Sequence, residues 1–206
     1  PRPVGDAAEA RLCQPIGEWG STVPPEGNLE AALDGSQVAG LVTQVQLAET
    51  GADFSCTSLG NDPVGLASPV TMRGVTAAYL FANTLVVLEV TEEVLRQTLE
   101  RCATYFTLVD GQPQIAEEFL LPKVEHYNYD FYAGLSYTFD LRRPVGRRAI
   151  HLAQLDASPL RGGPFRLFTS TYPPTGTRTS EIPPASPLRC PGIPEMPDRT
   201  PRTLHP

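Results

Sequence analysis

The sequence has few of the residues that hold metal ions or carry out nucleophilic catalysis. Its 206 residues include three histidines and four cysteines, and the cysteines stand singly at positions 13, 56, 102 and 190 without CxxC spacing. His126, His151 and His205 form no HxH, HExxH or DxH motif. Zinc centres and metal hydrolases are built from such spacings, so we expect no metal site within this chain. Spacing alone leaves the disulfide state open.

Other motifs that would identify an enzyme are also absent. The sequence has no GxSxG elbow, no P-loop and no GxGxxG, which argues against serine hydrolases, nucleoside triphosphatases and dinucleotide-binding enzymes. It has no apolar run of eighteen or more residues, so we expect no membrane span. It starts at Pro1 without a basic segment followed by an apolar one, and we therefore expect any signal peptide to lie outside a chain cut from a longer protein.

Positive charge is scarce as well. The formal net charge is −7, and the one dense basic cluster is "RRPVGRR" at 142–148. An acidic protein repels phosphate backbones at long range, so polymeric nucleic acid is not an expected partner. A small nucleotide is still compatible with this charge, because a binding pocket is local.

Proline marks the two ends of the chain. Residues 1–26 hold several prolines and little periodicity, which indicates a linker. Ten of the 22 prolines fall in residues 173–206, where no apolar period is found, and we expect a disordered tail there. One domain, residues 27–172, lies between these two segments.

Periodicity within 27–172 predicts a mixture of helices and hairpin-joined strands, which is the α+β class with a largely antiparallel sheet. Helical spacing covers 28–49, with Asn28 placed as its N-cap, and a helix is expected after Thr91, with Cys102 on its apolar face. Asp110 and Gly111 form a turn signal. The expected strands are 52–60, 68–73, 85–90, 147–156 and 164–171.

The stretch "YNYDFYAGLSYTFD", residues 127–140, concentrates the aromatic residues. Tyr127, Tyr129 and Phe131 share one parity, and Tyr137 and Phe139 continue it after a glycine, so a strand would place these rings on one face. Such a face could build the core of the sheet, or one ring at the strand entrance could be left exposed as a platform for a flat ligand. We expect the lone His126 and His151 to be polar residues at strand edges.

Several segments together resemble a known family. They are "GNLEAAL", "TGADFSCT", "FANTLVVLEVTEEVLRQTLE", "HYNYDFYAGLSYTFDLRRPVGRR" and "PFRLFTSTY". Their order is similar to the C-terminal domain of the 5'-nucleotidase and 2',3'-cyclic-nucleotide 2'-phosphodiesterase family. The resemblance covers about residues 27–172, and "YNYD" is similar to the cyclic-nucleotide branch.

The resemblance implies a role in holding substrate. Family members join an N-terminal metallophosphatase, with two divalent metals, to a C-terminal domain that clamps a nucleoside between two aromatic rings. It implies that Tyr129 is the first ring and Tyr172 the second. We therefore expect Tyr129 to be exposed, whereas Tyr137 and Phe139, which lie inside the regular alternation, should be buried. Asn83 and Asn128 fall near positions that could contact sugar or base.

The same resemblance implies the partners and location of the chain. We expect no cofactor in this chain, the N-terminal metallophosphatase domain as partner, and an extracellular, periplasmic or cell-wall location. The sequence departs from the family after Tyr172, where "PPTGTRTSE" replaces a glycine-rich stretch, so a truncated domain is expected. "SLGNDPVG" also stands where many members carry a phosphate-facing arginine. The alternative is a non-catalytic secreted binding module or a degenerate remnant.

Overall fold

The computed structural model describes residues 3–79, 84–161 and 163–171. Asn83, Tyr172 and the expected tail 173–206 lie outside the described residues. The helices are α1 (Pro3–Cys13), α2 (Asn28–Asp34), α3 (Gln37–Thr50), α4 (Met72–Ala78) and α5 (Glu92–Ala103), with short 3-10 helices η1 (Glu117–Phe119) and η2 (His126–Asn128). The strands are β1 (Pro15–Gly17), β2 (Phe54–Thr57), β3 (Val70–Thr71), β4 (Thr84–Val90), β5 (Phe106–Val109), β6 (Gln112–Ile115), β7 (Phe131–Ala133), β8 (Leu135–Phe139), β9 (Ala149–Gln154) and β10 (Phe165–Thr171).

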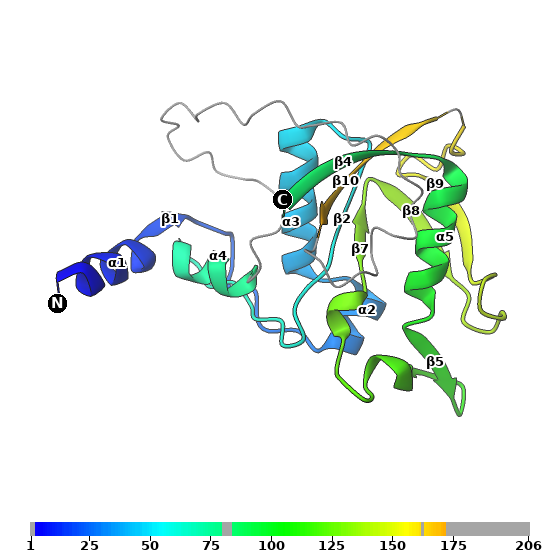
Figure 1. Cartoon of the computed structure of the whole chain (residues 1–206), viewed down its shortest axis with the longest axis horizontal. Coiled ribbons are helices and arrows are strands. Elements are labelled where there is room, and N and C mark those ends of the chain that lie inside the picture. Colours follow the sequence, from blue (N-terminus) through cyan, green and yellow to red (C-terminus); the bar gives the residue numbers. More distant parts are fainter. Residues whose placement is uncertain (1–2, 80–83, 162, 172–206) are drawn as a thin grey trace.

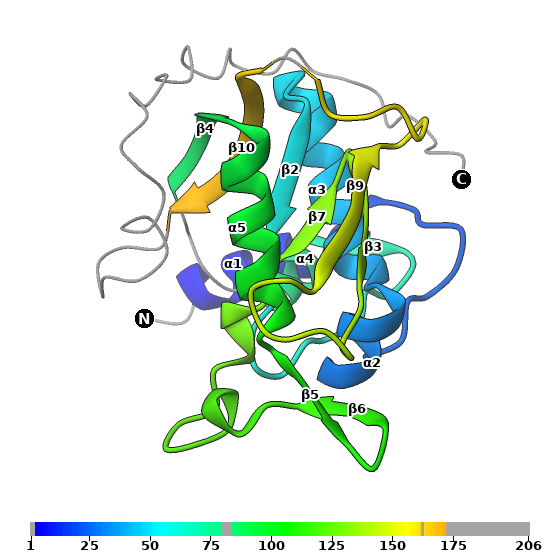
Figure 2. The same cartoon turned by 90° about the vertical axis from the view of Figure 1, so that its right-hand side faces the viewer.

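The described residues form a central four-stranded sheet in the order β4-β10-β2-β7, beside two-stranded ribbons β1-β3, β5-β6 and β8-β9. Strands β10 and β2 are parallel, and the other pairings are antiparallel. The helices α3 and α5 lie on opposite sides of this sheet (Figures 1 and 2). This arrangement confirms the α+β class with a largely antiparallel sheet.

Strand β2 shows why both sides of the sheet are covered. All four of its residues are buried. Phe54 and Cys56 belong to the cluster that includes Leu95 and Leu99 of α5. The alternate residue Ser55 donates a hydrogen bond to Gln46 Oε1 of α3. Because side chains alternate along a strand, one β2 face packs on α5 and the other on α3.

The helix α5 forms where the sequence predicts it. Thr91 is its N-cap, and the Thr91 hydroxyl oxygen accepts the Val94 N–H at 3.3 Å. Leu95 and Leu99 are fully buried, and Cys102 is a buried core residue as expected. The hairpin of β5 and β6 turns at Asp110 and Gly111, both with positive φ, as the Asp-Gly signal predicts.

The single helix expected over 28–49 is instead two helices. Gly35 has φ +90°, and Ser36 caps α3 by accepting the Ala39 N–H at 3.2 Å. A side chain that can cap competes with continuation of a helix, and glycine allows the break. Asn28 is not the N-cap, because Gly27 holds that position and the Asn28 amide instead donates to the Asn61 carbonyl.

The described part of the expected linker, residues 3–26, is structured. It contains α1 and β1, and β1 pairs with β3. Val23 is 3% exposed and belongs to a core cluster with Leu59 and Leu66. Packing therefore begins ahead of residue 27. The expected strand at 68–73 is shortened to β3, because Thr71 caps α4 by accepting the Gly74 N–H.

The aromatic stretch is not one strand. It consists of η2, β7 and β8, and the chain changes direction at Gly134, which has φ +90°. A Cβ atom at Gly134 would lie 2.4 Å from the Asp53 carbonyl oxygen, so a larger residue does not fit there. Strand β7 pairs with β2, whereas β8 pairs with β9. Tyr137 and Phe139 pack against the core but are only partly buried.

No helix among the described residues combines the length and the apolar character that a bilayer crossing requires.

Candidate functional site

Two of the predicted site residues, Asn128 and Tyr129, lie near one end of the central sheet, just before β7. Strands β2 and β10 are parallel and finish at this end, where β4 and β7 begin. We call it the Thr57 end, after the last residue of β2. Thr84 and Thr171 pair there across β4 and β10. They are the described sequence neighbours of Asn83 and Tyr172, which lie outside the described residues.

Tyr129 lies at the same end, just before β7, but its expected exposure is wrong. Its side chain is in the core, with the residue 5% exposed. The ring packs edge-on against Phe106 and Phe131 and tilted against Tyr105, with a centroid distance of 4.9 Å to Tyr105. Its hydroxyl donates to the Ala32 carbonyl oxygen of α2 at 3.1 Å. Burial raises the pKa of the Tyr129 phenol. Tyr129 therefore presents no free face on which a base could stack.

Asn128 is partly exposed in η2, beside Tyr129 in the sequence. Its Nδ2 atom donates to Glu125 Oε2 at 2.8 Å, and its backbone N–H donates to the Glu125 carbonyl at 3.0 Å. The other Glu125 oxygen, Oε1, accepts the Tyr127 hydroxyl at 3.0 Å. One carboxylate therefore holds the 3-10 turn that positions Asn128.

A histidine and a tyrosine meet next to this turn. The Tyr105 hydroxyl and His126 Nδ1 are 2.7 Å apart. Burial raises the pKa of Tyr105 to about 12, so the phenol keeps its proton, and the His126 tautomer determines which of the two groups donates in this hydrogen bond. Burial also lowers the pKa of His126, a change that the nearby Asp62 opposes. His126 is therefore neutral near pH 7 and lies in a 3-10 turn rather than at the strand edge expected.

The loop after β2 forms hydrogen bonds with two other segments at the Thr57 end. Asn61 Nδ2 donates to the Val124 carbonyl at 2.9 Å, and the Asn61 carbonyl accepts the Asn28 amide at 2.8 Å. The Asn61 Oδ1 atom is buried without a hydrogen-bond partner among the described residues. This loop links α2 to the segment that leads into η2. The loop therefore has a structural role. It stands at the position where the family resemblance would place a phosphate-facing arginine.

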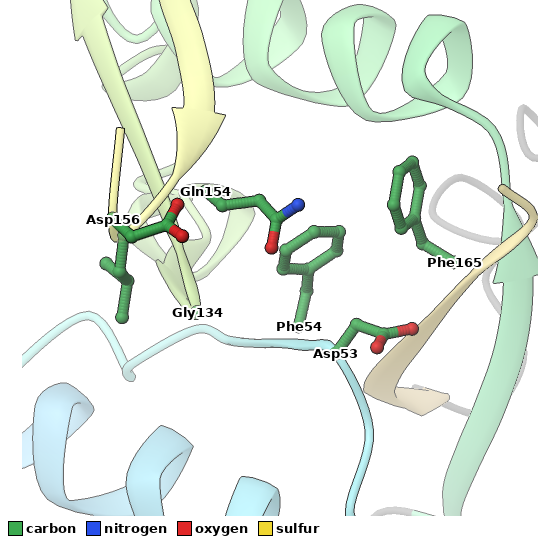
Figure 3. A pocket seen from close by; sticks show the side chains of 7 residues that line it. Asp53, Phe54, Gly134, Gln154, Asp156 and Phe165 are labelled. Atoms are coloured by element: carbon green, nitrogen blue, oxygen red, sulfur yellow. The ribbon is translucent and has the colours of Figure 1, made fainter. Parts of the chain in front are cut away.

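A hollow lies at the opposite end of the sheet. It is an open pocket of about 410 Å³, lined by Asp53, Phe54, Gly134, Gln154, Leu155, Asp156 and Phe165 (Figure 3). The Phe54 and Phe165 rings are 5.3 Å apart. The carboxylate of Asp53 accepts the Arg166 N–H at 2.7 Å, and that of Asp156 accepts the Ser158 N–H at 2.9 Å. Both carboxylates thus stabilise the local backbone, and the pocket contains none of the predicted site residues.

The described residues offer no group of three or more His, Cys, Asp or Glu side chains that could hold a metal ion. Cys13, Cys56 and Cys102 are free thiols. Of these, Cys56 and Cys102 are buried, and Cys56 donates to Thr169 Oγ1 at 3.2 Å.

Sequence reasoning did not reveal how the Thr57 end is built. The pairing of Tyr105 with His126 leaves no signal in spacing, because the two residues belong to different turns 21 positions apart. The two contacts of Asn61 likewise leave no local signal, because its partners Asn28 and Val124 are 33 and 63 positions away. The only sequence feature that could have suggested these contacts is an asparagine shortly after a buried strand.

Comparisons with known proteins point to one family. A family model described as 5'-nucleotidase, C-terminal domain, matches residues 20–177. A curated 2',3'-cyclic-nucleotide 2'-phosphodiesterase/3'-nucleotidase from Haemophilus influenzae is 28% identical over 169 residues, which are 70% of this chain and 25% of that protein. This chain therefore spans about a quarter of that relative.

Solved structures agree. A protein from Staphylococcus aureus, assigned as a 5'-nucleotidase and crystallised with alpha-ketoglutarate, is similar with a TM-score of 0.73 and 30% identity over 81% of this chain and 33% of that one. The NAD nucleotidase of Haemophilus influenzae shares the fold, with a TM-score of 0.60 and 17% identity over 82% of this chain and 30% of that one.

Proposed function

This chain belongs to the 5'-nucleotidase C-terminal domain family, and from that premise we propose that it is the nucleoside-binding domain of a phosphoric-ester hydrolase. Its substrate class would be nucleoside monophosphates or 2',3'-cyclic nucleotides, hydrolysed in nucleotide catabolism. The family match across 20–177 is the main support for this proposal, because the matched range includes Asn83, Asn128 and Tyr172. The curated relative that is named as a cyclic phosphodiesterase and 3'-nucleotidase favours the cyclic-nucleotide branch.

The proposed contacts lie at the Thr57 end. Tyr172 follows Thr171 in sequence and Asn83 precedes Thr84, and Thr84 pairs with Thr171 across β4 and β10. Asn128 supplies a third polar contact from η2. Tyr129 is assigned a supporting role, because its packed ring holds the start of β7 and reaches α2 through its hydroxyl.

Catalysis is assigned to a separate domain. The resemblance attributes two divalent metals to an N-terminal metallophosphatase domain, where the ions would activate water and stabilise charge on phosphorus. The described residues of this chain do not provide a ligand set for such a centre. We therefore propose that this chain orients the nucleoside while the partner domain supplies the chemistry, outside the cytoplasm or at the cell wall.

Titration of the full chain with adenosine, AMP and 2',3'-cyclic AMP tests this proposal, with chemical shifts as the readout. We expect Tyr172→Ala to weaken binding by roughly 1–3 kcal/mol, as for stacking rings on other platforms. Asn83→Ala and Asn128→Ala should weaken it by about 0.5–1.5 kcal/mol each, the net value of one hydrogen bond.

Gln97→Ala is the matched control, since it removes an exposed carboxamide on α5 that is bound to Glu93 and lies outside the proposed site. It should leave nucleoside affinity unchanged. Saturable binding that all four variants retain would refute the assigned site. If none of the three compounds bound to the folded wild-type chain, the alternative of a non-catalytic interaction module would be favoured.

A further inference from the structure

The turn between β8 and β9 is a basic feature on an acidic protein. Residues 140–148, "DLRRPVGRR", carry four arginines and one aspartate, a formal charge of +3, in a chain whose net charge is −7. We call this segment the arginine turn. It lies at the margin of the molecule in Figure 1, beside the end of α5. The site proposed above does not use it.

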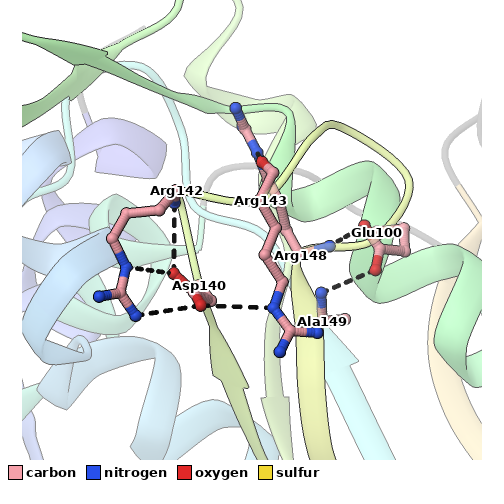
Figure 4. A network of polar contacts seen from close by, with 6 residues as sticks. All are labelled: Glu100, Asp140, Arg142, Arg143, Arg148 and Ala149. Carbon is pink, nitrogen blue, oxygen red and sulfur yellow. Dashed lines mark hydrogen bonds and ion pairs between the residues drawn. The ribbon is translucent and has the colours of Figure 1, made fainter.

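The Asp140 carboxylate binds two of the arginines, Arg142 and Arg143 (Figure 4). Asp140 accepts two hydrogen bonds from the Arg142 guanidinium, at 2.8 and 3.1 Å, and one ion pair from Arg143 at 3.3 Å. The Arg142 side chain is nevertheless 84% exposed and that of Arg143 52%, whereas Asp140 is only 15% exposed. Hydrogen bonding by Arg142 lowers the pKa of Asp140 to about 2. Asp140 thus holds one guanidinium group on each of its two sides and leaves both largely exposed.

The turn is firmly attached to α5. Glu100 accepts the backbone N–H groups of Arg148 and Ala149 at 2.9 and 2.7 Å. The Arg148 guanidinium in turn donates to the carbonyls of Ala103 and Phe106 at 2.9 and 2.7 Å. Carbonyls at a helix C-terminus otherwise lack donors, so this arginine serves the fold. The exposed arginines therefore stand on a rigid base.

An apolar residue occupies the tip of this turn. Val145 is 61% exposed, between Arg143 and Arg147 in sequence. Arg147 is exposed and makes no ion pair with any residue that the structure describes. Gly146 has φ +84°, and the Arg147 N–H donates to the Pro144 carbonyl at 3.1 Å, which closes the turn. An exposed apolar tip flanked by fixed cations is the pattern of an interfacial membrane contact.

We propose that the arginine turn docks on an anionic phospholipid surface, with Arg142, Arg143 and Arg147 on headgroup phosphates and Val145 at the acyl boundary. A soluble phosphate ion would make no contact with the apolar Val145 side chain. A nucleic acid extends over many base pairs, so its phosphates would also be repelled by the negative charge of the rest of the chain. At a membrane, only charges within about 8 Å of the surface count at physiological salt. The acidic body is then screened from the headgroups that the turn reaches.

Sedimentation with vesicles tests the proposal, using the full chain and vesicles of phosphatidylcholine with or without about 30% phosphatidylglycerol at physiological salt, where the Debye length is about 8 Å. We expect binding only to the anionic vesicles. The double variant Arg142→Gln/Arg147→Gln should reduce the partition coefficient about 25-fold, since each arginine near an anionic surface contributes roughly fivefold. The matched control is Arg11→Gln/Arg161→Gln, which removes the same charge from exposed sites elsewhere and should bind nearly as wild type.

Val145→Trp gives a second measurement. Its fluorescence, corrected for Trp19 with the wild-type chain, should shift to the blue on addition of anionic vesicles, because the tip enters a less polar layer. Melting curves establish that each variant is folded. Equal loss of binding in the two double variants, absence of wild-type binding to anionic vesicles, or binding to an oligonucleotide but not to vesicles would each overturn the proposal.

Discussion

Tyr129 is held by neighbours that lie far away in the sequence. Tyr105 lies in the turn after α5, Phe106 begins β5, and Ala32 comes from α2. A ring buried among three others contributes both apolar burial and aromatic contacts. Its hydroxyl is satisfied, so this ring can be buried without the cost of an unpaired polar group.

We therefore expect Tyr129→Ala to lower the free energy of unfolding by about 3–5 kcal/mol, as for large aromatic residues in cores. Tyr129→Phe should cost only about 1 kcal/mol, because it removes one hydrogen bond and keeps the ring. Urea unfolding followed by circular dichroism measures both. A loss below about 1 kcal/mol for Tyr129→Ala would contradict the core assignment.

His126 makes folding stability depend on pH. Its pKa is lowered in the folded state, mainly by burial, with Asp62 acting in the opposite direction. The unfolded chain then binds more protons than the folded one as pH falls, so the contribution of His126 is present above the unfolded pKa of about 6.5 and is lost as pH falls through the folded value.

The melting temperature of the wild-type chain should accordingly fall between about pH 8 and pH 5.5, where carboxylates of ordinary pKa remain ionised. His126→Gln should flatten this dependence, because it removes the titrating group while keeping a side chain that can accept from Tyr105. His151→Gln is the control, since His151 is exposed on β9. A slope that His126→Gln leaves unchanged would assign the pH dependence to another group.

At the scale of elements, Gly134 sets the direction of β7 and β8. Gly134→Ala should destabilise the protein by more than about 2 kcal/mol, since crowding of its Cβ against the Asp53 carbonyl adds to the strain of alanine at positive φ. Gly146→Ala separates the two causes, because Gly146 has φ +84° but nothing within 4 Å of a Cβ. We expect it to cost only the roughly 1–2 kcal/mol of the backbone strain. Equal unfolding midpoints for the two variants would show that crowding at Gly134 is unimportant.

The start of α5 permits a similar comparison. Thr91→Ala removes the hydroxyl that accepts the Val94 N–H and should cost about 0.5–2 kcal/mol of global stability. Thr71→Ala removes the equivalent cap of α4, a helix with no buried residues. Its effect on global unfolding should be smaller, because α4 contributes little to the core. Chemical denaturation of both variants measures the two losses of stability, and a larger loss for Thr71→Ala than for Thr91→Ala would contradict this expectation.

For the whole molecule, the assignment of catalysis to another domain has a direct consequence. The purified chain should release no phosphate from AMP or 2',3'-cyclic AMP with added Mn²⁺, Co²⁺ or Zn²⁺, because the described residues lack a three-ligand metal cluster. Phosphate release is the measurement. Metal-dependent turnover that follows this chain through further purification steps would contradict the assignment.

The sequence by itself determined the elements whose signals are local. The Thr91 cap, the apolar period of α5 and the Asp110-Gly111 hairpin need only neighbouring residues, and each appears where predicted. The α+β class follows from the same local patterns. The family resemblance rests on the order of short motifs, which a sequence also displays directly, and the family model confirms it.

The tertiary structure alone decided where the aromatic rings face. The alternation of side chains predicts that Tyr129 lies on a strand face. Whether its ring is exposed depends on Tyr105, in the turn after α5, and on Ala32 of α2. The break at Gly134 likewise depends on the approach of Asp53, about 80 residues earlier. Periodicity describes how side chains alternate within an element. It contains no information on which distant backbone will pack against that element, and these long-range contacts fix the burial of each ring.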